Sequence, residues 1–191
     1  MDKPLFLFVG RSASGKTSIA DALEQKYNYK QVQSYTTRPP RYDGEIGHIF
    51  VGEDEFNNLG NLVAYTEYNG HKYGTTSEQL DECSIYVVDV PCVETLLEKY
   101  KSNRFIVIFY FDTTAYTRIN RMINRGDSNA QIVSRLLQDE KDDWLNQLDH
   151  LVWQYNHLIG KNVDLYSINA NGEQTNVLEM ILYYINKYVE V

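Results

Sequence analysis

Residues Gly10–Thr17 read G-R-S-A-S-G-K-T, which matches the Walker A phosphate-loop pattern in full. The loop follows an apolar run, Pro4–Val9, and precedes a helical repeat of apolar positions at Ile19, Leu23 and Tyr27. A strand, a glycine-rich turn and a helix in this order point backbone N–H groups and the positive end of the helix at a phosphate. The sequence therefore predicts a nucleotide-phosphate site within an α/β fold.

Three kinds of residue in this loop have distinct tasks. The glycines let the backbone wrap a phosphate, Lys16 can reach the outer phosphates, and the hydroxyl of Thr17 suits Mg²⁺. An ordinary glycine-rich turn, the alternative interpretation, does not need both of these side chains. The predicted nucleotide-contacting positions are consecutive: Gly10, Arg11, Ser12, Ala13, Ser14, Gly15, Lys16, Thr17 and Ser18.

Strand and helix signals alternate along the chain, which predicts an α/β fold with a mostly parallel β-sheet flanked by helices. The expected strands are Leu5–Val9, Gln31–Tyr35, Ile85–Asp89, Phe105–Phe111 and Leu165–Ile168, and the expected helices are Lys16–Tyr27, Pro91–Tyr100, about 114–124, about 130–157 and about 177–188. Between about 34 and 80 this alternation of strand and helix signals gives way to prolines, glycines, tyrosines and short strand-like pieces. We interpret this stretch as a small β-rich insertion in a single domain, 1–191, whose core is 1–33 and 81–191.

Length and composition limit the kind of protein. With 191 residues the chain can bury one substantial core but is short for two independent domains. No stretch approaches the roughly 20 apolar residues of a membrane span, and the first strand begins almost at once, so we expect a cytoplasmic protein without a signal peptide. Cys83 and Cys92 are expected to be reduced thiols.

The net charge of −8 argues against a nucleic-acid surface. An acidic chain that gathers its arginines into two short segments is expected to bind a small, compact anion.

The first of these segments is Ser34–Arg41, S-Y-T-T-R-P-P-R. Its two prolines stiffen the backbone and favour an extended conformation for Arg38. Two planar guanidinium groups, at Arg38 and Arg41, on a stiff support suit bidentate binding of a phosphate. On spacing alone, a solvated basic turn remains the alternative.

Several segments match one family in combination. Behind the Walker A loop, Ser34–Arg41, Gly44–Gly47 and Gly70–Thr75 carry S-x-T-T-R-x-P-R, G-E-x-G and G-x-x-Y-G-[ST]. Together with Val88-Asp89 and the segment Arg121–Leu136, they resemble guanylate kinase, a nucleoside monophosphate kinase with a phosphate loop (P-loop), over about residues 5 to 185. The resemblance implies a P-loop kinase core, an insertion that holds the nucleoside monophosphate, and a helical lid at about 118–135.

The resemblance also implies roles for single residues and the cofactors ATP and Mg²⁺. Arg38 and Arg41 would grip the acceptor phosphate, and Thr75 would contact the base. Thr17 and Asp89 would lie at Mg²⁺, and Asn169 would lie beside the adenine of ATP. The residues expected to bind the acceptor are Ser34, Arg38, Arg41, His48, Tyr73, Thr75 and Asp89.

The second arginine-rich segment indicates a lid even when the family resemblance is left aside. Arg118, Arg121 and Arg125 are spaced i, i+3, i+7 and share one helical face, where like charges repel. Beside a phosphate loop, guanidinium groups that arrive on closure can stabilise phosphoryl transfer, and Gly126–Asn129 supplies a flexible tip. We predict Arg125 and Arg135 as catalytic, with Lys16 and Arg38; a solvated basic face is the alternative.

The sequence departs from the family at three places. Ala64 stands where guanylate kinases carry a glutamate that reads guanine, and Glu67 is expected on the opposite face of the strand unless a bulge shifts the register. His48 stands nearest to the position of a family tyrosine that touches the monophosphate, although a surface histidine is an equal interpretation. Pro91 replaces a second aspartate. An acceptor that bonds a base edge is worth about 1–3 kcal/mol, so these changes bear on base preference more than on binding itself.

The leading hypothesis is therefore an ATP-dependent nucleoside monophosphate kinase that transfers phosphate to GMP or dGMP. A kinase for another nucleotide or for a phosphosugar is the first alternative, and a non-catalytic interaction domain is the second. The expected partners are small-molecule nucleotides, with no nucleic acid and no membrane, for a monomer or a homodimer.

Overall fold

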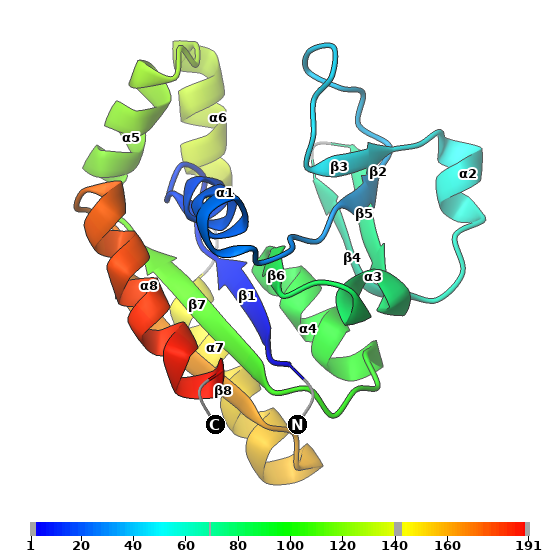
Figure 1. The fold of residues 1–191 in the computed structure, drawn as a ribbon. Coiled ribbons are helices and arrows are strands. Elements are labelled where there is room, and N and C mark those ends of the chain that lie inside the picture. The colour runs from blue at the N-terminus through cyan, green and yellow to red at the C-terminus, as the bar shows by residue number, and fades with distance from the viewer. Residues whose placement is uncertain (1–2, 69, 140–142, 190–191) are drawn as a thin grey trace.

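A computed structural model describes residues 3–68, 70–139 and 143–189 (Figure 1). The elements follow in the order β1 (Leu5–Val9), α1 (Lys16–Tyr27), β2 (Ser34–Thr36), β3 (His48–Phe50), α2 (Glu53–Asn57), β4 (Leu62–Tyr68), β5 (His71–Thr76), α3 (Ser77–Asp81), β6 (Ile85–Val87), α4 (Val90–Lys99), β7 (Ile106–Asp112), α5 (Ala115–Asn124), α6 (Asn129–Asp139), α7 (Trp144–Gln154) with a π-helical turn (Tyr155–Ile159), β8 (Val163–Asn169) and α8 (Gln174–Val189).

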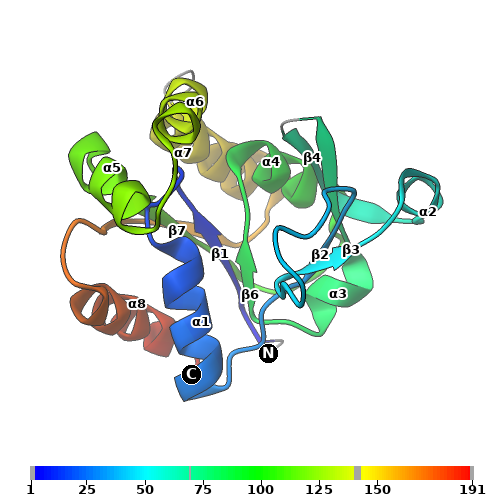
Figure 2. The same ribbon diagram turned by 90° about the horizontal axis from the view of Figure 1, so that it is seen from above.

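Within the described residues, four parallel strands form the core sheet in the order β6-β1-β7-β8. All five residues of β1 are buried, as expected of a central strand that is covered on both faces. Seen from above, α1 and α8 lie on one face of this sheet and α4 and α7 on the other (Figure 2). The predicted α/β class, with a parallel sheet flanked by helices, is confirmed.

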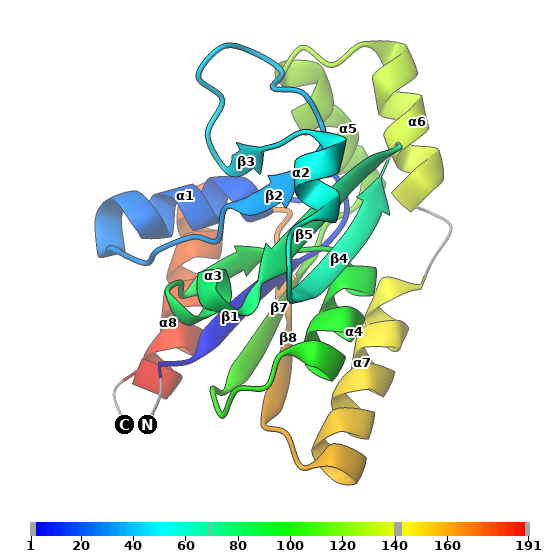
Figure 3. The ribbon, with the colours of Figure 1, turned by 90° about the vertical axis from the view of Figure 1, so that its right-hand side faces the viewer.

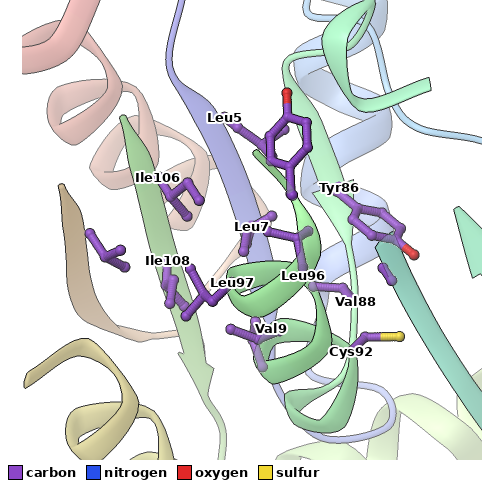
Figure 4. Packing of buried hydrophobic residues seen from close by; sticks show 14 of the residues in the cluster. Leu5, Leu7, Val9, Tyr86, Val88, Cys92, Leu96, Leu97, Ile106 and Ile108 are labelled. Carbon is purple, nitrogen blue, oxygen red and sulfur yellow. The ribbon is translucent and has the colours of Figure 1, made fainter. Parts of the chain in front are cut away.

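The side chains of β1 alternate between two hydrophobic layers. Leu5, Leu7 and Val9 pack toward α4 and α7 (Figure 4), whereas Phe6 and Phe8 pack toward α1 and α8. Burial of each such side chain contributes about 1.5–3 kcal/mol. The central strand is therefore fixed by both layers, and so is the point at which the phosphate loop leaves it.

Local signals in the sequence set the helix boundaries next to the site. Gly15, in the left-handed conformation with φ of 101°, precedes α1, and Asn28, at φ of 60°, ends it while its N–H donates to the carbonyls of Glu24 and Leu23. Asp89 caps α4, because its carboxylate accepts a hydrogen bond from the N–H of Cys92. The predicted bounds of β1 and α1 are confirmed to the residue.

The β-rich segment forms a second sheet with the order β3-β2-β5-β4 among the described residues. It rises above the core next to the carboxyl ends of the core strands (Figure 3). Its strand β4 is anchored in the core, because Val63 and Ala64 belong to the same buried cluster as Val93 and Leu96 of α4. The helix pair α5 and α6 stands on the other side of the phosphate loop (Figure 1).

Two predicted elements are wrong in their extent. The strand expected at Gln31–Tyr35 begins only at Ser34 and joins the second sheet, while Gln31 makes one isolated bridge to Ile85. The N–H of Gln31 donates to the side chain of Glu24, so it is not available to extend a ladder. The helix expected at 130–157 is divided into α6 and α7, because Asp143, with φ of −86° and ψ of 75°, is not helical; residues 140–142 lie outside the described part.

Two further observations concern the chain as a whole. Cys83 and Cys92 are free and buried, as expected. Among the described residues, no helix has both the length and the apolar composition needed to cross a lipid bilayer.

Candidate active site

The phosphate loop turns sharply out of β1. Gly10 has a φ of 153°, and a Cβ atom there would lie 2.9 Å from the carbonyl oxygen of Phe111, so no side chain fits. Ala13 is in the left-handed region with a φ of 59°. Strand β7 thus presses against the start of the loop, and the residues from Ala13 onward curl back toward α1.

Lys16 lies folded over this loop. Its ammonium nitrogen, Nζ, donates to the carbonyl oxygens of Gly10 at 2.6 Å and Arg11 at 3.0 Å. Burial lowers the pKa of Lys16 to about 8, against the opposing influence of the carboxylates of Asp139 and Asp89. A partly desolvated cation whose partners are neutral carbonyls is a strong attractor for an anion.

Two cavities border Lys16. The first, of about 380 Å³, lies between the phosphate loop and the start of α8. It is lined by the loop and helix residues Ala13, Ser14, Gly15, Lys16, Thr17, Ser18 and Ile19 together with Arg121, Arg125, Ala170, Gln174 and Val177. Among the predicted loop positions, Gly10 and Ser12 border the second cavity instead.

Arg121 links two of the segments that line the first cavity. Its guanidinium group donates to the carbonyl of Ser14 at 2.9 Å and to that of Ala170 at 2.7 Å, so it joins the phosphate loop to the end of β8. Burial lowers the pKa of Arg121. Asn169 lies next to Ala170 at the end of β8, where its side-chain oxygen accepts the N–H of Asn171 at 3.1 Å, and its predicted contact with adenine stays a prediction.

The second cavity, of about 330 Å³, lies between the loop and the second sheet. It brings together predicted residues from three parts of the chain, with further side chains that the sequence did not single out. Its lining consists of Gly10, Ser12, Lys16, Ser34, His48, Thr66, Glu67, Tyr68, Tyr73, Tyr86, Val87, Val88, Asp89, Pro91, Cys92, Gln138, Asp139 and Trp144. The two cavities therefore share one residue, Lys16.

The arginine pair is held by a carboxylate. Arg38 makes a bidentate contact with Glu45, with Nη2 at 2.8 Å from Oε1 and Nη1 at 3.2 Å from Oε2. The same carboxylate accepts the N–H of Arg41 at 2.6 Å, whereas the guanidinium of Arg41 is 64% exposed and 3.7 Å away. Arg38 in turn lowers the pKa of Glu45 to about 2. The guanidinium group of Arg38 also lies 5.3 Å from the ring centre of Phe50.

Three further predicted acceptor residues are neighbours at the wall of the second cavity. His48 Nδ1 is 3.0 Å from the hydroxyl of Ser34, and its ring lies edge-on to that of Tyr73, with 5.6 Å between ring centres. Burial lowers the pKa of His48, and the charge of Arg38 lowers it further. At neutral pH this ring is uncharged, so it does not carry the positive charge that would favour a phosphate.

The predicted base-contacting residue is turned away from the lining. Thr75 is fully buried and its hydroxyl donates to the hydroxyl of Tyr86 at 2.8 Å, so Tyr86 rather than Thr75 borders the cavity. Ala64 pairs with Thr75 and is also fully buried. The bulge in β4 lies between Leu62 and Ala64, before the segment that leads to Glu67. Glu67 still borders the cavity, where its carboxylate accepts a hydrogen bond from the hydroxyl of Tyr65.

The predicted metal ligands lie in different cavities. The hydroxyl of Thr17 borders the first cavity, and the carboxylate of Asp89, whose other contact caps α4, borders the second. Among the described residues no cluster of three or more histidine, cysteine or carboxylate side chains could hold a metal ion. One hydroxyl, one carboxylate and phosphate oxygens fit Mg²⁺, which keeps several waters and is commonly bound through one or two carboxylates and the substrate.

Helices α5 and α6 carry the remaining arginines. Arg125 forms an ion pair with Asp127 at the tip between the helices, and Arg135 lies 3.7 Å from the same carboxylate. Arg125 borders the first cavity, whereas Arg135 is in the lining of neither cavity, and Asp127 is the partner of both. Arg118 is fully buried and pairs with Asp139.

Sequence reasoning missed Glu45, Tyr86 and Asp139. Glu45 stands in the G-E-x-G pattern, which carried the signal without its role. Tyr86 and Asp139 are members of apolar and amphipathic runs, and only tertiary packing brings them to the second cavity.

The chain is similar to guanylate kinases. It is 28% identical to the guanylate kinase of Lactobacillus acidophilus over 94% of each chain, and 28% identical to that of Thermotoga maritima over 80% of this chain and 79% of the relative. The solved guanylate kinase of Anaplasma phagocytophilum has the same fold, with a TM-score of 0.54 and 14% identity over 98% of this chain and 87% of that one. No family model matches the chain. The resemblance found in the motifs is thereby confirmed, and the relatives indicate a phosphotransferase, a nucleotide kinase.

Proposed function

We propose that this chain, a nucleotide kinase of the guanylate kinase type, transfers the γ-phosphate of ATP to GMP or dGMP and releases GDP or dGDP. The observation that carries the proposal is the shared position of Lys16 between two cavities. ATP occupies the first cavity with its phosphates on the loop Gly10–Ser18, and the acceptor occupies the second. Its phosphate then approaches the γ-phosphate at the lysine.

The acceptor phosphate binds at Arg38 and Arg41, with Ser34, His48 and Tyr73 beside it. Arg38 is preorganised by Glu45, which fixes its planar group beside the ring of Phe50. A fixed guanidinium loses little conformational freedom when it binds a phosphate in bidentate fashion. Arg41 is free to turn toward the ligand because its guanidinium is exposed.

Thr17 and Asp89 would hold Mg²⁺, which would supply positive charge to the phosphates during transfer. Lys16 does the same from the protein side. Because the attacking group is a phosphate oxygen that is already anionic, no side chain is needed as nucleophile, and the protein's task is alignment and charge neutralisation.

We also propose that α5 and α6 act as the lid, that 34–80 acts as the acceptor-binding insertion, and that the whole chain is one domain. On closure Arg125 and Arg135 exchange Asp127 for phosphate oxygens. Asp127 serves as a placeholder anion, because Arg125 is paired with its carboxylate and Arg135 lies 3.7 Å from it. Closure also excludes water and limits ATP hydrolysis.

A second candidate function, with the same chemistry and another acceptor, is favoured by the buried Ala64. The face of β4 that pairs with Thr75 offers no carboxylate to the N1 and amino hydrogens of guanine. Tyr86 and Thr66 border the cavity on that side and supply neutral hydroxyls. Another nucleotide or a phosphosugar is compatible with these groups.

The deciding experiment measures transfer from ATP to GMP, dGMP, AMP, CMP, UMP, dTMP and ribose 1,5-bisphosphate under identical conditions. The proposal predicts the highest kcat/KM for GMP or dGMP. A higher value for any other acceptor selects the second function, and absence of transfer to all of them contradicts both.

A further inference from the structure

Asp139 connects three elements of the site. It is the last described residue of α6 and is 4% exposed. Its Oδ2 accepts a hydrogen bond from Nη1 of Arg118 at 2.7 Å and from the backbone N–H of Ser12 at 3.0 Å, and its Oδ1 lies 3.3 Å from the hydroxyl of Ser12. One carboxylate thus joins α5, α6 and the phosphate loop.

The ion pair alone does not explain this arrangement. A buried arginine and carboxylate lose hydration that their attraction only partly restores, so apolar residues of similar size often stabilise a fold equally well. Arg118 loses all of its hydration in the folded chain, because none of its surface reaches solvent. What apolar residues at 118 and 139 could not do is accept the N–H of Ser12. The distinctive contribution of the pair is therefore its contact with the loop.

Ser12 occupies a decisive position in that loop. The residues before it, Gly10 and Arg11, supply the carbonyls that hold Lys16. The residue after it, Ala13, has a left-handed backbone, which costs a residue other than glycine about 1 kcal/mol or more and persists only where the surroundings fix it. A carboxylate that fixes Ser12 acts on both sides of the loop at once.

We propose that Asp139 is a positioning residue for the phosphate loop, and that Arg118 keeps its carboxylate in place. Through Ser12, helix α6 sets the loop conformation in which Lys16 faces both cavities. The base of the lid helix α6 is therefore coupled to the ATP site. This inference rests on the proposed function only where transfer is the readout, because ATP binding reports the loop directly.

The test compares two double variants that both lack the buried charges. R118L/D139N keeps a side-chain oxygen that accepts the N–H of Ser12, whereas R118L/D139L fills the same space without an acceptor. The quantities measured are the ATP–Mg²⁺ dissociation constant and kcat. We expect R118L/D139L to be weaker than R118L/D139N by about tenfold or more in both, as for the loss of one strong hydrogen bond.

Thermal melting of both variants shows whether a merely structural role accounts for the result. Equal ATP affinity and equal kcat in the two double variants would overturn the proposal, whatever their melting temperatures. If the wild-type protein transfers phosphate to no acceptor, the proposed function fails, but the ATP affinities still decide this inference.

A measurement on the wild-type protein covers the case in which a double variant does not fold. Amide hydrogen exchange by NMR reports the N–H of Ser12 directly. The proposal predicts slow exchange for this amide in the nucleotide-free protein, and exchange at the rate of an open loop contradicts it.

Discussion

The phosphate loop and the arginine segment of the second sheet both carry cations that we propose to bind phosphate, but with opposite electrostatics. Lys16 is held by neutral carbonyls, and burial lowers its pKa to about 8. Arg38 is held by the carboxylate of Glu45, and this contact raises the pKa of Arg38. A bound anion is therefore strongly stabilised by Lys16, which has no anionic hydrogen-bond partner among the described residues. At Arg38 the anion competes with Glu45 for a cation that is already paired. We infer that the loop is built for strong, indiscriminate binding of polyphosphate and that the second sheet is built for exchange of one acceptor after another.

The largest effect should come from removal of the lysine. Lys16→Ala is expected to lower kcat by about a thousandfold or more for every acceptor, because the charge between the two cavities is lost. The matched control is Lys26→Ala in the last turn of α1, which should leave the rate unchanged. Steady-state rates with a saturating acceptor measure both. A loss limited to one acceptor would contradict the central position of Lys16.

Removal of the exposed arginine should produce a smaller and different effect. Arg41→Ala is expected to raise the KM of the acceptor about tenfold and to change kcat by less than about threefold, because the residue contributes binding of a phosphate that is present before and during transfer. Initial rates over a range of acceptor concentrations separate the two constants. An unchanged KM would remove Arg41 from the acceptor site.

The lowered pKa of Lys16 makes ATP binding depend on pH. A bound polyphosphate favours the protonated form of Lys16. Above about pH 8 the lysine of the free protein is mostly neutral, so the protein must take up a proton when ATP binds. The affinity for ATP–Mg²⁺ should therefore hold below pH 7.5 and fall by up to about tenfold per pH unit above 8. Titration calorimetry in buffers of different ionisation enthalpy measures the proton uptake.

Lys16→Arg supplies the control for this pH dependence, because a guanidinium remains charged throughout the range. Its affinity should be lower but flat between pH 7 and 9. A wild-type affinity that is equally flat would show that the lysine stays protonated in the free loop.

The smallest effect concerns stability and tests how strongly Arg38 is held by Glu45. Glu45→Gln is expected to lower the free energy of unfolding by about 1 kcal/mol at pH 7, because the contact with Arg38 is bidentate and only partly exposed. Glu45 has a pKa of about 2 in the folded chain and 4.5 when unfolded, so its contribution is complete above pH 4.5 and disappears as the pH falls toward 2. Urea denaturation at pH 7 and pH 3 should show a difference between the proteins that shrinks at the lower pH.

The same two regions differ in how far the sequence predicts them. In the phosphate loop and α1, the signals are local: glycines where the backbone needs a positive φ, a lysine and an apolar repeat, all within one short stretch. Prediction of the fold class and of the bounds of β1 and α1 from sequence therefore succeeds. The sequence also singles out the segment with Arg38 and Arg41, whose role stays a prediction, but it does not show the partner that holds Arg38, because Glu45 approaches it only after the loop between them folds back.

Contacts between distant parts of the chain lie beyond such reasoning. Arg118 and Asp139 are 21 positions apart and meet only because α5 and α6 pack side by side against the loop. The burial of Thr75 behind Tyr86 likewise depends on how β5 lies against β6. Periodicity marks such residues as belonging to a helix or a strand, and it cannot name the atom that each side chain will meet.

The anchoring of β4 in the core restricts how the acceptor side can move. Val63 and Ala64 share their apolar surroundings with α4, and the carbonyl of Gln33, where the chain leaves the core, accepts a hydrogen bond from Gln79, where the chain returns. A swing of the second sheet about a free hinge would expose that shared apolar surface to water. Any approach of the sheet toward the lysine must instead be a sliding displacement of β4 along α4, short in range and with its dry contact preserved.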